Sequence, residues 1–555
     1  MRSRVGAGLI LAQSGATAER VPPNSVAHPA IVSARAVGGR HYDVLVVGAG
    51  HNGLVAALCA ARAGLSVLVV ERADVIGGAT RTEHPFASAP ELPHSTGAYL
   101  LGLMPPELLQ KLELQIPLLR RDPHYFLPRM QQGYLLFGSD QAELERQFVQ
   151  FFSRADFDAH LGLQAELAAL RQDIAPSWLR QPHSIEETAE RYVRPALRQV
   201  FVRLCRGSVG EYLDRFGFES DLVKAMYAVT DGFSGLYGSY DTPGTGMNFL
   251  IHNMCRLPGS DGTWMIVEGG MGTVARVLAD ALARHGGSIV VGAPVASVIV
   301  EGGTARGVVL EDGSEIRARA VLVNADPFRM QALVGADRLP PEYNARLSAM
   351  KRPGSTFKLN LALERAPRFR CLAQHGPQFG PTIHLLPEGG SVLAELDRGW
   401  RAVQAGKLAD FPSIEWYMHS TVDPSLSDAR GRISSAFFVQ WVPYELSEGS
   451  WDVEAERYAR HLLEIADQFA PGTSALVSDW QILHPQKIEQ YFGISHGHIH
   501  HIDNSFGFAD RLPHRTPIAG LYSASAGTHP AGSVIGCAGY LAASECLRDL
   551  GVSPA

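Results

Sequence analysis

The part of the sequence best suited to chemistry is a glycine-rich turn followed, at a fixed distance, by an acid. Gly48, Gly50 and Gly53 are spaced Gly-x-Gly-x-x-Gly, and Glu71 lies 18 residues beyond the last of them. The first glycine allows a tight turn, the second lets the backbone approach a pyrophosphate, and the third lets a helix pack against a strand. An acid at this distance can accept hydrogen bonds from the ribose hydroxyls of an adenosine. The spacing therefore predicts a site for a dinucleotide, either NAD or FAD.

The segments on either side have the patterns needed to position that turn. Residues 44–47 form a continuous apolar run rich in β-branched side chains, which is typical of a strand buried on both faces. Residues 54–63 are rich in Ala and Leu and predict a helix, and residues 65–70 predict a second strand that ends at Glu71. Together they predict a βαβ unit, in which the helix N-terminus offers free N–H groups and a positive dipole to phosphates.

Two later glycine-rich stretches are candidates for the same site. Gly77 and Gly78 follow the acid closely and begin the sequence G-G-A-T-R-T-E, which by itself is only a turn signal. Near the C-terminus, residues 518–523 predict a strand that leads through the glycines of 527–539 into a helix over 540–550. A strand that ends in a glycine turn at a helix N-terminus is again an anion site.

The middle of the chain predicts further strands for the nucleotide sheet. After the sequence E-G-G-M-G, residues 273–285 have helical periodicity, and apolar runs separated by glycine turns predict a β-meander over 288–323. Its final strand, residues 316–323, can return to the nucleotide sheet. No buried strand leads directly into residues 269–272, so this stretch is not a second dinucleotide fingerprint. We therefore expect one nucleotide site and no separate NAD(P)H domain.

Two long segments outside these patterns predict a second domain. Residues 101–261 are mostly helical by periodicity, and their apolar faces are typical of a core. A lipid-like substrate tunnel or a membrane-facing patch is the alternative interpretation of those faces. Residues 330–500 alternate between strand and helix patterns. The clearest predicted elements are helices over 141–179, 192–216 and 454–469 and strands over 356–363 and 436–441.

Two sets of polar side chains in this second domain are candidates for chemistry. Lys358 lies in a predicted strand and could be a buried base, but an edge-strand lysine is more often solvated, which is the interpretation we prefer. His496, His498, His500 and His501 crowd into one glycine-containing loop, without the spacing or acidic partners of a metal site. We therefore expect no metal, and a polar loop over the mouth of the active site.

Composition limits the class of protein. The chain has 555 residues, 46% of them hydrophobic, and a mean hydropathy of −0.01, so it can form two or more cores. A net charge of −7 gives no basic footprint for nucleic acid, which we exclude as a partner. The six cysteines never form C-x-x-C, which excludes a dithiol redox motif and fits a reducing compartment. No apolar run approaches the roughly 18 residues of a spanning helix.

Residues 1–40 differ from the rest of the chain. They carry five arginines against a single acid, Glu19, together with small residues and two consecutive prolines. This composition is typical of a mitochondrial transit peptide and equally of a disordered tail, and both interpretations stay open. The localisation that follows is the mitochondrial matrix for a transit peptide and the cytoplasm otherwise.

Five motifs stand in order over almost the whole chain after residue 41: V-V-G-A-G-H-N-G-L-V-A-A, G-G-A-T-R-T-E, E-G-G-M-G, L-E-D-G-S-E-I-R-A-R-A-V and T-H-P-A-G-S-V-I-G. In this arrangement the chain resembles the pyridine nucleotide-disulphide oxidoreductase domain-containing protein 2 family, within the phytoene desaturase and flavin amine oxidase superfamily. The resemblance implies an α/β fold, with a Rossmann-like FAD-binding domain of the glutathione-reductase type and a discontinuous α+β substrate domain. It also implies non-covalent FAD as the cofactor.

The resemblance assigns domains and site residues as well. Composition predicts a flexible leader or targeting tail over 1–40. The resemblance implies an FAD-binding domain over 41–105, 260–335 and 505–555, and a substrate domain over 106–259 and 336–504. The cofactor-binding residues that it implies are Gly48, Gly50, Gly53, Glu71, Arg72, Gly78, Arg81, Val295, Gly532, Ser533 and Val534. Among these, Val295 packs against the adenine, and the last three lie where a helix dipole stabilises the reduced flavin at its N1/O2 edge. His529 and His501 are the candidate catalytic side chains.

The function that the resemblance implies is that of an FAD-dependent oxidoreductase removing a hydride from an apolar or lipid-like small molecule. Among enzymes, a carotenoid or retinoid desaturase or ketolase predicts membrane association and a long apolar tunnel. An amine oxidase predicts an aromatic pair that frames the flavin face. The alternative from another class is a non-catalytic FAD-bound protein that regulates a protein partner. Peripheral membrane contact stays open.

Overall fold

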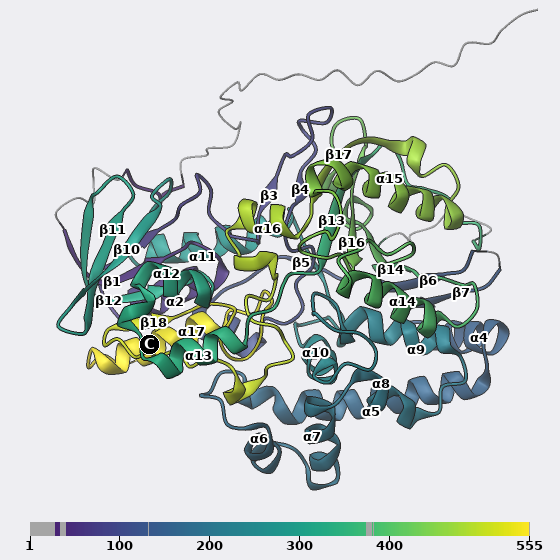
Figure 1. Cartoon of the computed structure of the whole chain (residues 1–555), viewed down its shortest axis with the longest axis horizontal. Helices are drawn as coiled ribbons and strands as arrows, with labels where there is room; N and C mark the ends of the chain where they lie inside the picture. The colour runs from purple at the N-terminus through teal and green to yellow at the C-terminus, as the bar shows by residue number, and fades with distance from the viewer. Residues whose placement is uncertain (1–27, 34–39, 131, 373–379, 381, 554–555) are drawn as a thin grey trace, which may run out of the picture.

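Two seven-stranded sheets organise the chain, of which the computed structural model describes residues 28–33, 40–130, 132–372, 380 and 382–553. Figure 1 shows the sheets side by side, the first sheet at the left around β1 and β12 and the second sheet at the right around β13 and β16. The first sheet is built from three segments distant in sequence, within residues 41–70, 288–323 and 521–523. The strands of the second sheet lie within 125–137 and 356–483.

Five strands of the first sheet are parallel, in the order β9-β2-β1-β12-β18. β10 and β11 extend the sheet from β12 as an antiparallel meander. Val44 to Val46 of β1 are completely buried, because both faces of the parallel part are covered. The strands are β1 (His41–Val47), β2 (Val67–Val70), β9 (Ser288–Val290), β10 (Val295–Glu301), β11 (Thr304–Leu310), β12 (Glu315–Val323) and β18 (Leu521–Ser523).

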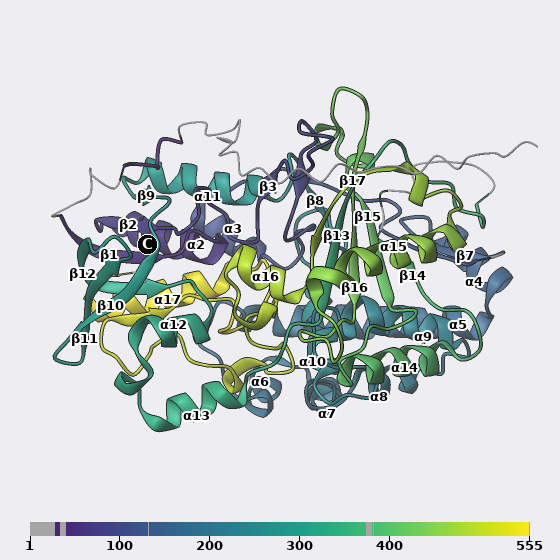
Figure 2. The same ribbon diagram turned by 45° about the horizontal axis from the view of Figure 1, so that its top comes forward.

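Side chains alternate along β1 and so meet different layers on the two faces of the first sheet. Val44 and Val46 pack in one core with α2, α11 and α17, whereas Leu45 and Val47 pack with the meander, α12 and α13. Figure 2 shows α11 along one side of this part of the molecule and α12 and α13 along the other. These helices are α2 (His51–Arg62), α11 (Gly272–Arg284), α12 (Pro327–Val334), α13 (Pro341–Ala349) and α17 (Cys537–Asp549). The predicted βαβ unit is confirmed, and so is the meander over β10 to β12, with ends that differ by at most three residues. The first strand predicted for the meander, β9, instead pairs in parallel with β2 at the other edge of the sheet.

The second sheet is mostly antiparallel, in the order β17-β13-β16-β15-β14-β6-β7. Its apolar face packs against α15 (Trp451–Phe469), with Trp416 and Phe437 completely buried between them. In Figure 1 a layer of helices, α4 to α10, lies on the opposite side of this sheet from α15. The strands are β6 (Tyr125–Pro128), β7 (Tyr134–Phe137), β13 (Thr356–Leu363), β14 (Thr382–Leu385), β15 (Ser413–Met418), β16 (Ile433–Gln440) and β17 (Val477–Leu483).

The region predicted to be mostly helical is so, but it also contributes a hairpin, β6–β7, to the second sheet. Sequence periodicity does not reveal this hairpin, because each strand has only four residues and its pairing partner β14 is distant in sequence. The remaining helices are α3 (Pro106–Leu112), α4 (Gln141–Phe151), α5 (Arg154–Ile174), α6 (Ile185–Tyr192), α7 (Arg198–Arg206), α8 (Val209–Leu213), α9 (Asp221–Tyr227), α10 (Thr245–His252), α14 (Val392–Gln404) and α16 (Pro485–Phe492). Two short strand pairs are β3 (Thr82–Glu83) with β4 (His94–Ser95) and β5 (Leu118–Leu119) with β8 (Ile266–Val267).

Part of the region expected to be a leader packs against the first sheet. Val32 N–H donates to Ile289 O, and Ile289 N–H donates to Ala30 O, so residues 28–33 pair with the outer edge of β9. These six residues thus add a short bridge to the edge of the sheet. The transit-peptide and tail predictions for residues 1–27 and 34–39 lie outside the described residues. The described part of the chain contains no helix with the length and hydrophobicity that a membrane span requires.

The packing of α17 on α2 leads to the first prediction. A Cβ at Gly539 would overlap the carbonyl oxygen of Asn52, so the two helices meet backbone to backbone. We expect Gly539→Ala to force α17 away from α2 and to lower the free energy of unfolding by about 3 kcal/mol, at the upper end for overpacking. Thermal unfolding followed by circular dichroism measures this change.

The control for this prediction is Gly162→Ala in α5. The new Cβ would meet only the Phe216 ring, at 3.6 Å, so the variant should be neutral or more stable by up to about 1 kcal/mol. Equal unfolding temperatures for the two variants would contradict the close packing of α17 on α2.

Candidate functional site

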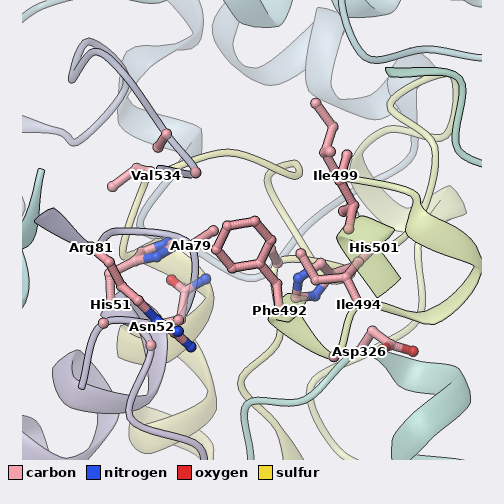
Figure 3. Close-up of a pocket in the computed structure, with 18 of the residues that line it drawn as sticks. His51, Asn52, Ala79, Arg81, Asp326, Phe492, Ile494, Ile499, His501 and Val534 are labelled. Atoms are coloured by element: carbon pink, nitrogen blue, oxygen red, sulfur yellow. The ribbon is translucent and has the colours of Figure 1, made fainter. Parts of the chain in front are cut away.

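One cavity of about 660 Å³ connects the two sheets. It begins at the carboxyl ends of β1 and β2, where ligands bind in open parallel sheets, and extends to the second sheet at Lys358 and Glu415. The residues labelled in Figure 3 form two groups in this view, with the Phe492 ring between them: His51, Asn52, Ala79 and Arg81 on one side, and Ile494, Ile499 and His501 on the other. The cavity therefore joins the predicted nucleotide turn to the second sheet.

The β1–α2 turn forms the first end of the cavity, which Gly48 and Gly50 line. Gly48 has a φ of 99°, a conformation that favours glycine. Gly50 is the N-cap of α2, and within the described structure no side chain caps this helix and its first turn holds no acid. The first-turn N–H groups are therefore available to an anion. Gly53 is not part of the lining, and a Cβ on it would overlap Gly48 O, so it serves the packing of α2 against the turn.

Two side chains fix the position of this turn. Glu71, at the end of β2, accepts hydrogen bonds from the backbone N–H groups of Ala49 and Ala73, at 2.8 and 2.9 Å. Asn324, at the end of β12, accepts from Gly50 N at 3.2 Å when its amide is oriented to satisfy both polar atoms. Glu71 also lines the cavity, and its carboxylate has lone pairs left for ribose hydroxyls.

Three more of the predicted residues, Arg72, Gly78 and Arg81, line the cavity beside the turn. Gly78 approaches Gly50 so closely that a Cβ on Gly78 would lie 3.2 Å from the Gly50 Cα. Arg81 is buried, and its Nε has no hydrogen-bond partner among the described residues. Its Nη1 lies 3.7 Å from the Glu83 carboxylate. A buried guanidinium with unused donors is suited to a phosphate.

The C-terminal stretch reaches the cavity at Ser533 and Val534. Gly532 does not line it: its N–H donates to Asn504 Oδ1 at 2.9 Å, and a Cβ on it would overlap the backbone of His500. Gly532 therefore allows close packing of two loops rather than contact with a ligand. The final helix, α17, begins beyond this turn, with Gly536 at its N-cap.

The residues at this end of the cavity fit a dinucleotide. Besides the uncapped helix N-terminus, three lining side chains have buried polar atoms with no partner in the part of the chain that the structure describes: His51 Nε2, Asn52 Oδ1 and Arg81 Nε. Buried polar atoms of this kind require a ligand or an ordered water. In this arrangement the α2 N-terminus and Arg81 would hold the pyrophosphate, Glu71 and Val295 the adenosine, and Ser533 and Val534 the second ring system.

The two candidate catalytic histidines lie in different places. His501 lines the cavity with its Nδ1 3.0 Å from Ser525 Oγ, and burial lowers its pKa to about 4, so it is neutral at pH 7. His529 is not part of the lining; it is buried with its Nε2 3.3 Å from Ser177 O. Of the two, only His501 is placed to touch a ligand in the cavity.

The loop of four histidines reaches the cavity with two of them, His500 and His501. His498 is buried and hydrogen-bonds instead to the Asp503 carboxylate at 3.1 Å. Within the described residues, no group of three His, Cys, Asp or Glu side chains is arranged to hold a metal ion. The loop thus combines one internal polar pair with a wall of the cavity.

The prediction of a solvated Lys358 is wrong. β13 lies between β17 and β16 rather than at an edge, and Lys358 is only 5% exposed. Its Nζ lies 3.6 Å from the centre of the Tyr99 ring and 4.8 Å from that of Phe438. Burial lowers the pKa of Lys358 to about 7, and the nearby Glu415 opposes this shift. A lysine that is partly neutral at pH 7 can exchange a proton at the cavity wall.

Strand register places Lys358 in a row of side chains across the second sheet. Lys358 pairs with Phe438, Phe438 with Glu415, and Glu415 with His384. The four side chains therefore point to one face of the sheet, and the first three line the cavity. Glu415 accepts a hydrogen bond from Tyr417 OH at 2.5 Å. Sequence reasoning missed Glu415, because only the pairing of distant strands brings it beside Lys358.

A further acid, Asp231, enters the cavity from the helical layer. It lies in a π-helical turn, Ala228–Gly232, a type of turn that is frequent at functional sites. Its Oδ2 accepts a hydrogen bond from Asn253 Nδ2 at 3.0 Å, and its Oδ1 lies 3.9 Å from His252 Nδ1. Burial raises the pKa of Asp231 to about 7 and lowers that of His252 to about 4. The surrounding sequence carries no signal for this turn, so sequence analysis missed Asp231 as well.

Comparisons with known proteins agree with this geometry. The family described as flavin-containing amine oxidoreductase matches residues 53–397. The pyridine nucleotide-disulfide oxidoreductase domain-containing protein 2 of Rattus norvegicus is 34% identical over 92% of this chain and 94% of its own. A lycopene-forming phytoene desaturase from a Paracoccus strain is 25% identical over 91% of this chain and 97% of its own. The solved structure of a putrescine oxidase variant has a TM-score of 0.58 at 16% identity, over 92% of this chain and 99% of that one.

The burial of Lys358 leads to a prediction about stability and pH. Because the folded state lowers the pKa of Lys358 to about 7, it binds fewer protons than the unfolded state up to about pH 10.5. The lysine therefore destabilises the fold at neutral pH, at ~1.4 kcal/mol for each unit by which its pKa is lowered. We expect Lys358→Met to raise the free energy of unfolding by about 2 kcal/mol at pH 7, and by less as the pH rises toward 10.

Unfolding temperatures of both proteins at several pH values between about 6.5 and 9.5 measure this effect, because this range lies below the ordinary pKa of a lysine. Lys351→Met, on the exposed loop before β13, is the control and should change little at any pH. A gain that is constant across the pH range, or that Lys351→Met shares, would show that the charge of Lys358 is not its cause.

Proposed function

Because the chain belongs to the flavin-containing amine oxidoreductase family, we propose that it dehydrogenates a small, largely apolar molecule by hydride abstraction to FAD. The predicted family and the general class, an FAD-dependent oxidoreductase of α/β fold, are confirmed. The substrate is the part that we propose, and the walls of the cavity support it.

The observation that supports the proposal most directly is the continuity of the cavity. The space that contacts the glycine turn also contacts the aromatic rings of Tyr99, Trp264 and Phe438, and Phe438 lies on β16 of the second sheet. A substrate that rests on these rings shares the space with a cofactor bound at the turn, which is the proximity that hydride transfer needs. Mostly apolar walls also exclude water from the reaction.

FAD, held at the β1–α2 turn, would supply the redox chemistry as the acceptor of a hydride from a substrate C–H bond. The side chains of the chain supply position and proton exchange. Tyr99 and Tyr417 pack with their ring centres 5.2 Å apart in the cavity wall, and their hydroxyls donate to Asn360 and Glu415. Lys358 lies against the Tyr99 ring, where its lowered pKa lets it hold or release a proton near pH 7.

The cavity favours a compact substrate over a long polyene. Its volume of about 660 Å³ has to hold a dinucleotide as well as the substrate. Two acids, Asp231 and Glu415, also line it, whereas a carotenoid or retinoid desaturase or ketolase calls for a longer and less polar channel. The pair formed by Tyr99 and Tyr417 is the feature expected of an amine oxidase, so it favours an apolar amine as the second candidate substrate.

The glycine turn provides a prediction about the cofactor. A Cβ at Gly50 would lie 2.8 Å from the Asn324 amide, and it would also stand between the backbone and a pyrophosphate. We expect Gly50→Val to be purified with less than about a tenth of the FAD of the unchanged protein, as each 1.4 kcal/mol lost is tenfold in affinity. Absorbance of the flavin after gel filtration measures this. Gly162→Ala should keep full FAD, and a fully yellow Gly50→Val protein would place the cofactor elsewhere.

Single-turnover reduction is the direct experiment on the proposed reaction. The FAD-loaded protein is mixed without oxygen with apolar alkenes, alcohols and amines, and the flavin absorbance is followed with time. We expect the absorbance to fall with at least one compact apolar compound, because hydride transfer reduces the flavin. No reduction by any of these compounds, in protein that dithionite reduces normally, would reject the proposed function.

A further inference from the structure

Asp231 is a largely buried acid at the second-domain end of the cavity. Its side chain is 15% exposed, and its Oδ1 accepts no hydrogen bond from any residue that the structure describes. Burial raises its pKa and the Arg171 guanidinium opposes this shift, but the Arg171 Nε donates to Asn253 O, and among the described residues Arg171 makes no ion pair with Asp231. His252, whose Nδ1 is 3.9 Å from Asp231 Oδ1, has its pKa lowered by burial to about 4 and is neutral at pH 7. A buried carboxylate is costly unless a donor or a cation pairs with it. Asp231 Oδ1 therefore has no hydrogen-bond donor among the described residues, and a ligand can supply one.

Glu415, the acid of the second sheet that lines the same end of the cavity, already has its partners. It accepts hydrogen bonds from Tyr417 OH at 2.5 Å and from Ser234 Oγ at 3.3 Å, and its charge raises the pKa of Lys358 against the effect of burial. Both carboxylate oxygens of Glu415 thus have a hydrogen-bond donor. Of these two carboxylates, only that of Asp231 keeps an oxygen, Oδ1, without a donor among the described residues.

Lys358 provides an independent sign of a polar ligand group. It is 5% exposed, lines the same cavity, and contacts only the Tyr99 and Phe438 rings, with no hydrogen-bond acceptor among the described residues. The second-domain end of the cavity thus presents an unused donor, Lys358 Nζ, as well as an unused acceptor, Asp231 Oδ1. A purely hydrocarbon ligand would leave both unsatisfied, which is costly in a buried site.

We propose that Asp231 binds a hydrogen-bond-donating head group, a hydroxyl or an ammonium, on an otherwise apolar substrate. The aromatic lining holds the apolar body, and Asp231 Oδ1 accepts the hydrogen bond of the head group. This inference rests on the proposed function, because only that function makes the ligand of Asp231 the substrate. It narrows the substrate class from apolar molecules in general to those that carry one donor.

Binding to the FAD-loaded protein tests this inference with three probes of equal chain length: n-octylamine, 1-octanol and n-octane. Affinities come from the perturbation of the oxidised flavin spectrum and, independently, from the shift in unfolding temperature. We expect octylamine or octanol to bind about tenfold more tightly than octane, because one charge-assisted hydrogen bond at a buried site is sufficient for this ratio. Tighter binding of octylamine identifies an ammonium site, and equal or tighter binding of octanol identifies a hydroxyl site. If octane binds to the unchanged protein as tightly as octylamine and octanol do, the inference is overturned.

Two variants assign the effect to Asp231. Asp231→Leu removes the acceptor and should weaken both octylamine and octanol about tenfold, whereas Asp231→Asn removes only the charge and should weaken octylamine alone. Neither should change octane binding. Asp241→Asn removes the same charge from an exposed position outside the cavity, and it is the control. Unchanged octylamine and octanol binding in yellow, folded Asp231→Leu would overturn the inference.

The outcomes separate this inference from the proposed function. Flavin reduction by a hydrocarbon, with no preference for donors and no effect of Asp231→Leu, rejects the head-group site and leaves the dehydrogenase. If the protein binds the hydrogen-bond-donating probes more tightly through Asp231, but no compound reduces the flavin, the binding site is kept and the proposed reaction is rejected.

Discussion

Close contact between backbones around α2 is the constraint on which the rest of the structure depends. Gly53 lets α2 begin against the carbonyl of Gly48, and Gly539 lets α17 cross α2 at the carbonyl of Asn52. Because side chains are excluded at both contacts, the N-terminus of α2 is held at the end of β1 by segments from opposite ends of the chain. Its free N–H groups and the positive end of its dipole therefore face the cavity in one fixed direction.

The elements around this contact could be predicted because their signals are local. The run of buried β-branched residues, the glycine spacing and the acid at position 71 all fall within about thirty residues, and each follows from backbone geometry. The meander over β10 to β12 is predictable for the same reason, since its turns contain paired or single glycines between short apolar runs. Local patterns fail where the same motif fits two roles of a glycine, contact with a ligand and close packing of the backbone. Gly532 stands in the expected motif, but it packs against His500 instead of lining the cavity.

The other end of the cavity could not be predicted, because non-local pairing creates it. The sequence T-F-K-L-N-L-A-L alternates like a half-exposed strand, but β13 has neighbours on both sides, and its polar face looks onto an internal space instead of solvent. Glu415 joins Lys358 only through the register of β16, and Asp231 reaches the same cavity through a π-helical turn. His529 is the opposite case. It stands in a recognisable motif, but the structure buries it against Ser177 O, away from the cavity.

Burial shifts the pKa values of two side chains in the cavity, Asp231 and Lys358, in opposite directions and toward the same value. It raises the pKa of Asp231 and lowers the pKa of Lys358, in each case to about 7. At pH 7 neither group is held firmly in one protonation state, so a proton can enter or leave this end of the cavity at little cost in free energy. A substrate that loses a hydride becomes electron-poor and must also lose a proton, and a group with a pKa near 7 in the cavity wall can accept it. The same burial that shifts the two pKa values thus prepares groups that can exchange this proton.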